Sequence, residues 1–168
     1  MLADRQKEQV DTREILTSLQ EVQAATLRVA SATKRLMTIY TPDLEPILYD
    51  QPKFLDTVKR LVLASGYAKV RVLLADPARA LYESSRFIGL ARRITSYIEV
   101  RHLHPQYRNQ QSAFLIGDDR AILYRLDSKR WDGIYHSGDP AIARPYLDSF
   151  NQAWDASDPD AETRQRYL

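Results

Sequence analysis

The sequence contains no cysteine among its 168 residues. This absence excludes disulfide bonds, a thiol nucleophile, and zinc or iron–sulfur sites that depend on cysteine. Glycine is also scarce, with 5 residues, so a glycine-rich loop that cradles a phosphate is not expected. No apolar run approaches the ~18 residues that a membrane-spanning helix needs, and the first ten residues are polar and charged. We therefore expect a cytoplasmic protein without a membrane segment.

Basic residues are present in slight excess, giving a formal net charge of +2, and they are unevenly distributed. Residues 86–130 carry 9 Lys and Arg against 4 Asp and Glu, whereas residues 131–168 carry 3 against 7. Arginine outnumbers lysine 18 to 6, and its planar guanidinium suits two-point contact with phosphates and carboxylates. This pattern is compatible with an anionic partner, but GC-rich coding alone also produces arginine-rich surfaces.

The N-terminal part of the chain has the pattern of one long helix over residues 4–35. Apolar residues recur at roughly helical spacing, and the stretch lacks proline and glycine. Such a helix is not stable alone. It must therefore pack on its own domain or on a partner, which leaves intramolecular packing and homodimerisation as alternatives.

The rest of the chain alternates between strand and helix patterns before it reaches a hairpin. Lys69–Ala75 has a nearly continuous apolar run, which indicates a buried strand with parallel neighbours. Asp76 and Pro77 have the residue types of an N-cap and a first helical position. The expected helices cover residues 53–65, 77–94 and 141–154, and the expected strands cover residues 36–41, 69–75, 97–103, 112–116 and 120–126, with a loop or short strand at 129–137.

This order predicts an α/β fold with a mixed β-sheet flanked by helices and preceded by a long N-terminal helix. The predicted organisation is an N-terminal helix at 1–35, an α/β domain at 36–156 and a polar C-terminal tail at 157–168. Gly117-Asp118-Asp119 is the expected turn between the two hairpin strands.

The order of elements, the hairpin with its acidic turn and the Leu-Leu-Ala-Asp-Pro stretch at 73–77 resemble one half of a phospholipase D-type enzyme. Enzymes of that superfamily carry His-x-Lys-x4-Asp along the first hairpin strand. Here Gln111 and Ala113 stand at the histidine and lysine positions, and only Asp118 of the motif remains. After the second strand, Tyr124-Arg125 replaces the family's Gly-Ser.

A closer resemblance, carried by residues 41–50 and 158–162, is to an uncharacterised bacterial family of catalytically degenerate domains of this type. Its members sometimes accompany N-acetyltransferase domains, which implies an acyltransferase partner. In active relatives, histidine forms a phospho-histidine intermediate and lysine stabilises developing negative charge. The amide of Gln111 is a poor nucleophile and Ala113 supplies no cation. The resemblance therefore implies a protein without phosphodiesterase activity.

His102 and His104 fall on one face if the strand at 97–103 continues, and with a nearby aspartate they could ligate a metal ion. The alternative, which we favour, is a pair of ordinary surface histidines before Pro105. Arginines and aromatic residues that could converge near the degenerate motif are Arg92, Arg93, Arg101, Arg108, Arg120, Arg125, Arg130, Tyr107, Tyr124, Trp131 and Tyr135.

The leading hypothesis is a non-catalytic binding module for nucleic acid or a phosphorylated ligand, needing no cofactor. The predicted ligand-binding residues around the vestigial cleft are Gln111, Asp118, Arg120, Arg125, His102, His104 and Arg108. The alternative is a scaffold or regulatory domain that dimerises, or docks on a partner enzyme, through its N-terminal helix. A metal-dependent hydrolase ranks last.

Overall fold

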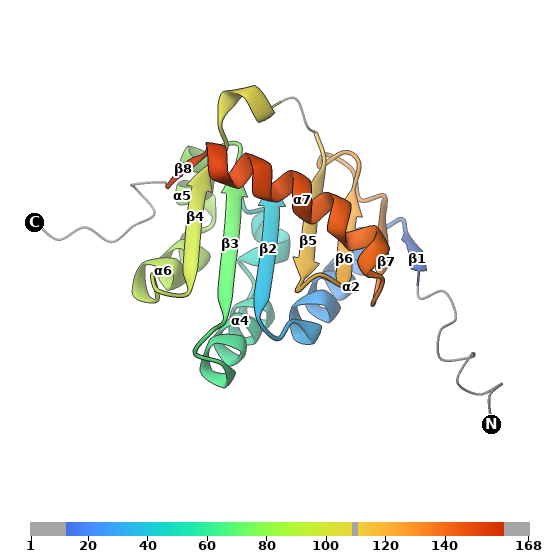
Figure 1. Cartoon of the computed structure of the whole chain (residues 1–168), viewed down its shortest axis with the longest axis horizontal. Coiled ribbons are helices and arrows are strands. Elements are labelled where there is room, and N and C mark those ends of the chain that lie inside the picture. Colours follow the sequence, from blue (N-terminus) through green and yellow to red (C-terminus); the bar gives the residue numbers. More distant parts are fainter. Residues whose placement is uncertain (1–12, 109–110, 160–168) are drawn as a thin grey trace, which may run out of the picture.

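The computed structural model describes residues 13–108 and 111–159. Figure 1 shows one sheet with the long C-terminal helix lying across one face and the remaining long helices behind the other. The strands are β1 (Arg13–Leu16), β2 (Leu36–Thr41), β3 (Lys69–Leu74), β4 (Ile98–His102), β5 (Ala113–Gly117), β6 (Ala121–Arg125), β7 (Gly133–His136) and β8 (Asp158–Pro159). The helices are α2 (Leu19–Ala32), α3 (Pro46–Tyr49), α4 (Pro52–Ala64), α5 (Pro77–Glu83), α6 (Ser85–Arg93) and α7 (Pro140–Ala156), with a 3-10 turn, η1, at Pro105–Tyr107.

The sheet is mixed, as the sequence predicts, with the strand order β1-β7-β6-β5-β2-β3-β4-β8. β2, β3 and β4 are parallel neighbours, while β5, β6 and β7 are antiparallel. We call the edge where β2, β3 and β4 terminate the carboxyl end of the sheet, and the edge where they begin the amino end. Because β5 runs against β2, with Tyr40 opposite Phe114 and Met37 opposite Gly117, the β5–β6 turn lies at the amino end.

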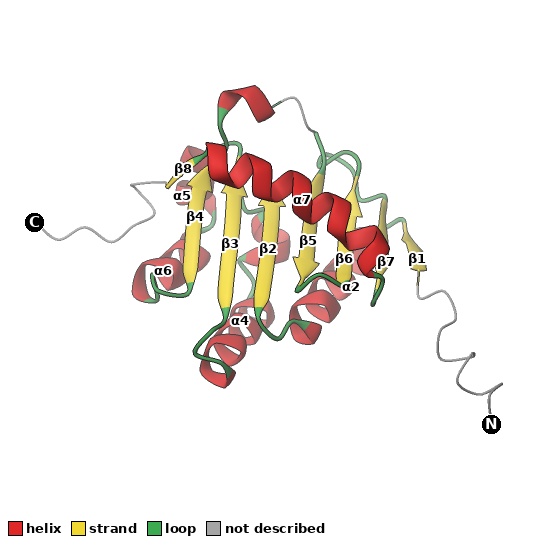
Figure 2. Ribbon diagram, in the orientation of Figure 1, coloured by secondary structure: helices red, strands yellow, loops and turns green. Residues whose placement is uncertain are grey.

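Both faces of the sheet are covered, so the core has two parts (Figure 2). One part packs α2, α4 and α6 on alternate residues of the central strands, such as Ile39 and Val72. The other packs α7 on the opposite face, where Phe150 and Trp154 meet Tyr40 and Phe114. No helix in the described part of the chain is long and apolar enough to cross a membrane.

The single helix expected over 4–35 is wrong for residues 13–18 and 33–35. Residues 13–16 form β1, and α2 starts only after Ser18, whose hydroxyl oxygen accepts a hydrogen bond from the Glu21 amide at 3.2 Å. The carboxylate of Glu21 accepts in turn from the amide of Thr17 at 3.4 Å. This reciprocal N-terminal capping marks the true helix start. Residues 4–12 lie outside the described residues.

The helix expected over 77–94 is broken in two. Asp76 caps α5 as predicted, accepting from the Arg79 amide at 3.2 Å. However, Ser84 is buried and non-helical between α5 and α6, and its hydroxyl donates to the carbonyl oxygen of Leu44 at 3.3 Å. The hydrogen bond made by Ser84 therefore connects α5 and α6 to the loop after β2.

At the end of the described chain, the first residues of the segment expected as a polar tail join the sheet. Asp158 and Pro159 form β8 and pair with β4. Ser157 is buried, and its hydroxyl accepts from the His104 amide at 3.0 Å. The remaining residues of that segment, 160–168, lie outside the described residues.

Candidate binding site

The predicted site residues separate to the two ends of the sheet. Arg125 ends β6 opposite Ala113, and His102 ends β4 opposite Leu74, so both lie at the carboxyl end. Asp118 and Arg120 belong to the β5–β6 turn at the amino end. The predicted site residues therefore do not share one cleft. Asp118 and Arg120 do not belong to a site that contains Gln111 and Arg125.

Arg125 is an internal structural cation rather than a ligand-binding one. Its side chain is almost completely buried and forms an ion pair with the carboxylate of Glu45. Nη1 also donates to the carbonyl oxygens of Ser128 and Arg130, at 2.9 and 3.0 Å. The guanidinium carbon lies 5.0 Å from the centre of the Trp131 ring. Because its charge is paired and its hydrogen-bond donors are used within the protein, Arg125 is poorly suited to bind a phosphate.

Glu45 is a buried ionisable residue that the sequence interpretation did not single out. It lies in the loop after β2, is 8% exposed, and accepts a hydrogen bond from the Thr41 hydroxyl at 3.0 Å. Burial raises the pKa of Glu45, and the nearby Arg125 guanidinium opposes that effect. The preceding Leu44 has a φ of 59°, a conformation that is uncommon for a leucine. A left-handed leucine beside a buried carboxylate indicates a loop held tightly by its surroundings.

The positions of the degenerate motif contain no nucleophile. Ala113 is buried in β5. Gln111 is exposed, and its carbonyl oxygen accepts a hydrogen bond from the Ser128 amide at 2.7 Å. The main chain of Gln111 thus fastens the loop that also surrounds Arg125, while its amide side chain faces solvent.

The two histidines at this end have separate surroundings. Nε2 of His102 lies 2.6 Å from Nη2 of Arg108; because a guanidinium only donates, this nitrogen accepts. Nδ1 of His104 accepts from the Gln106 amide at 3.2 Å, which caps the turn η1. Within residues 13–108 and 111–159, no group of three or more His, Asp or Glu side chains is placed to hold a metal ion.

Asp118 is a structural clamp at the amino end. Its carboxylate accepts hydrogen bonds from the amides of Lys34, Arg35 and Leu36 at 2.9–3.0 Å. It also has a φ of 55°, which aspartate tolerates better than most residues. The clamp fixes the β5–β6 turn against the start of β2, and the neighbouring Arg120 projects into solvent.

The wider arginine set does not converge on one place. Arg101 pairs with Glu99 and lies 4.2 Å from the Trp154 ring centre, on the face covered by α7. Arg130 pairs with Asp132 in the loop before β7. Arg92 and Arg93 end α6 and therefore lie toward the amino end.

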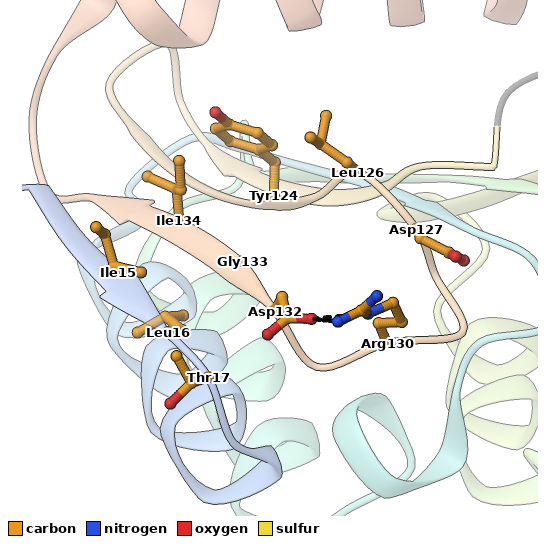
Figure 3. A pocket seen from close by; sticks show the side chains of 10 residues that line it. All are labelled: Ile15, Leu16, Thr17, Tyr124, Leu126, Asp127, Arg130, Asp132, Gly133 and Ile134. Carbon is orange, nitrogen blue, oxygen red and sulfur yellow. Dashed lines mark hydrogen bonds and ion pairs between the residues drawn. The ribbon is translucent and has the colours of Figure 1, made fainter.

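A hollow of about 450 Å³ lies between β1, β7 and the loop after β6 (Figure 3). Ile15 and Leu126, 68% and 77% exposed, are among its lining residues, and the ion pair of Arg130 and Asp132 lies on one side. The sequence interpretation missed this hollow because it assigned Ile15 to a helix. Its full lining is Ile15, Leu16, Thr17, Tyr124, Leu126, Asp127, Arg130, Asp132, Gly133 and Ile134.

Solved structures with this architecture include phospholipase D-family proteins. TrmBL2, an archaeal chromatin protein described as showing a novel mode of DNA binding, matches with a TM-score of 0.66 and 14% identity over 95% of this chain. Nuc from Salmonella typhimurium, a phospholipase D family member, matches with a TM-score of 0.61 and 12% identity, covering 88% of this chain and 97% of Nuc. NucT from Helicobacter pylori matches with a TM-score of 0.60 and 11% identity, covering 89% of this chain and 98% of NucT.

These similarities confirm the phospholipase D-like fold that the sequence resemblance predicts. The chain spans 58% of the length of TrmBL2. No curated protein matches the sequence. The model of a family described as a domain of unknown function, DUF7931, matches residues 18–165. The chain therefore belongs to the DUF7931 family.

Proposed function

We propose that this protein is a non-catalytic module with a phospholipase D-like fold that binds an anionic partner, specifically a nucleic acid. The observation that carries the first half of the proposal is the buried pair of Glu45 and Arg125 beside Ala113. A carboxylate neutralises the cation at the end of β6, and the adjacent motif positions hold a methyl group and an amide. Phosphodiester cleavage by this fold needs a nucleophile and a cation for the developing charge, and these positions supply neither.

The binding half of the proposal is supported by the exposed basic residues of the chain and by TrmBL2, a chromatin protein of similar fold whose structure is described as showing a novel mode of DNA binding. Arginine side chains that are not paired internally can contact phosphate. Arg120 is such a residue, with a side chain 72% exposed and only a 4.0 Å contact to Asp119.

One preparation tests both halves. Purified protein is incubated with a chromogenic phosphodiester, with and without chelator, and separately titrated into labelled single-stranded and duplex DNA at rising salt. We expect no hydrolysis and a binding affinity that falls with salt. Hydrolysis that scales with protein concentration and survives chelation would overturn the non-catalytic assignment. Absence of binding at low salt to either DNA would remove the nucleic acid.

The scaffold alternative through the N-terminal helix has less support. The apolar face of α2 is already occupied, because Val22, Ala25 and Val29 are buried in the core of the same chain. A homodimer or an acyltransferase partner would have to use a different surface. Equilibrium sedimentation at several concentrations measures whether a dimer forms.

A further inference from the structure

The amino end of the sheet has an exposed cluster of basic residues. Its members lie in the segments that precede β2 and β4, at the start of β3 and in the β5–β6 turn: Lys34, Arg35, Lys69, Arg93 and Arg120, which we call the basic amino end. The acidic side chains nearby are Asp118 and Asp119 in the turn and Asp139, whose amide donates to the Arg120 carbonyl at 3.2 Å and whose carboxylate caps α7. Asp118 binds backbone amides, and Asp119 lies 3.1 Å from Arg144. The cluster therefore keeps a surplus of positive charge.

Backbone hydrogen bonds hold these segments side by side. The Asp118 amide donates to the Leu36 carbonyl at 2.7 Å, and the Lys69 amide donates to the Arg35 carbonyl at 2.8 Å. Further along, the ammonium group of Lys69 donates to the carbonyl oxygen of Ser96. With strands about 4.8 Å apart, the three steps from β5 to β4 span about 14 Å. The segments that carry these cations thus span a strip about as long as a few nucleotides.

The opposite end of the sheet has no such surplus among the described residues. The acidic residues Asp43, Glu45, Asp76, Asp127 and Asp132 lie there together with the basic residues Arg79, Arg108, Arg125, Lys129 and Arg130. Ion pairs join Asp43 to Arg79, Glu45 to Arg125 and Asp132 to Arg130. A polyanion is therefore attracted more strongly to the amino end than to the carboxyl end, where the degenerate motif positions Gln111 and Ala113 lie.

Helix dipoles explain only part of the cluster. α2, α4 and α6 all end at this edge, and their carbonyl termini favour nearby cations. Arg93 is the last residue of α6 and fits that role. Arg120 follows no helix, because it lies in the hairpin turn between β5 and β6. Its position is better explained by the shared surface than by a helix terminus.

A hollow of about 380 Å³ lies next to the strip. Lys69, Arg71, Tyr97, Glu99 and Trp154 are among the residues that line it. The ammonium group of Lys69 is 5.8 Å from the centre of the Tyr97 ring. Tyr67, just before β3, is 83% exposed. Cations beside aromatic side chains and a small hollow suit unpaired bases, which a duplex keeps stacked inside.

We propose that the basic amino end binds single-stranded nucleic acid, with phosphates on the strip and a base directed to the hollow beside Lys69 and Tyr97. This inference rests on the proposed nucleic-acid-binding function and assigns that function to a particular surface. If all five cations contact phosphates, the slope of log affinity against log salt reaches about −3.5, from about −0.7 per contact. Duplex DNA is expected to bind more weakly than single strands at equal salt.

Two variants with equal changes in charge test the surface. Arg35→Glu with Arg120→Glu alters the basic amino end, and Arg108→Glu with Lys129→Glu alters the carboxyl end. Labelled single-stranded DNA of mixed sequence is titrated by fluorescence anisotropy, and equal urea midpoints establish that both variants are folded. We expect the first variant to bind about tenfold or more weakly, with a salt slope flatter by about 1.4, and the second to bind nearly as wild type does.

A third variant examines the hollow. Trp131→Phe leaves Trp154 as the remaining tryptophan of the two in the sequence, and Trp154 lines the hollow. Its emission is expected to change as oligonucleotide binds, and an unchanged emission at saturation would refute the placement of a base there. Strong binding that is lost only in the carboxyl-end variant would refute the surface while leaving the proposed function intact. Failure of the wild type to bind would refute both.

Discussion

Glu45 and Arg125 form a buried ion pair that joins the loop after β2 to the last residue of β6. Replacing Glu45 by glutamine leaves an unpaired guanidinium in a site that solvent hardly reaches. Loss of one partner of a buried pair typically costs about 3–5 kcal/mol. We expect Glu45→Gln to lower the free energy of unfolding by that order, as measured by urea denaturation.

The exposed pair of Arg130 and Asp132 in the following loop provides the comparison. Both side chains are more than half exposed, and such pairs contribute about 0–1 kcal/mol. Asp132→Asn should therefore leave the urea midpoint nearly unchanged. If Glu45→Gln were equally mild, the pair would not hold the two loops together.

Asp118 should matter for stability far more than its neighbour Asp119. Asp118→Ala leaves the amides of residues 34–36 without their shared acceptor, and hydrogen bonds to a charged group each contribute about 1.5–3 kcal/mol. Because two of the three bonds are exposed and water can replace the acceptor there, we expect the total loss in the free energy of unfolding to be close to that of a single such bond, about 2–3 kcal/mol. Asp119→Ala removes an exposed contact with Arg144 and should cost less than about 1 kcal/mol. Equal losses for the two variants would contradict the clamp.

Two glycines are expected to respond to alanine with opposite signs. A Cβ on Gly117 would lie 2.6 Å from the Thr33 hydroxyl and 3.1 Å from the Val29 carbonyl oxygen. Since that hydroxyl is itself bonded to Val29, α2 would have to move, and overpacking of this kind costs about 1–3 kcal/mol. Gly89 lies within α6 with open space around it, so Gly89→Ala should add about 0.5–1 kcal/mol. Thermal melts of the two variants should shift in opposite directions.

Tyr146 is expected to lose its proton at a higher pH than an ordinary tyrosine. Its burial, and secondly its neighbour Tyr124, raise the pKa of Tyr146 to about 12. Between the ordinary tyrosine pKa of about 10 and that value, the folded state holds a proton that the unfolded state releases. Stability therefore falls as pH rises through this window, and less so in Tyr146→Phe. The difference in phenolate absorbance between wild type and Tyr146→Phe measures the midpoint, and a midpoint near pH 10 would contradict the burial effect.

Local patterns predicted the central part of the fold well. The apolar run of Lys69–Ala75 and the hairpin around Gly117 lie where the sequence placed them, because strand alternation and turn residues are local signals. β1 was missed because its partner, β7, lies near the other end of the chain. Pairing of that kind leaves little trace in a window of neighbouring residues. The capping residues Ser18 and Glu21 were the available sign that the helix starts late.

The site was predicted less well, for two reasons. The partnership of Glu45 with Arg125 depends on tertiary structure, and no spacing in the sequence reveals it. The separation of Asp118 from Gln111 could have been anticipated. A five-residue strand is about 17 Å long, so the turn of a hairpin and its open ends lie at opposite edges of a sheet.

Among the described strands, β1 pairs only with β7, and this has a consequence for the time course of folding. Contacts between distant segments require closure of a long loop before they return any free energy. β2, β3 and β4, with the helices between them, come from consecutive segments and can associate as soon as they leave the ribosome. We therefore expect the sheet to assemble from its middle outward, with β1 among the last strands to pair.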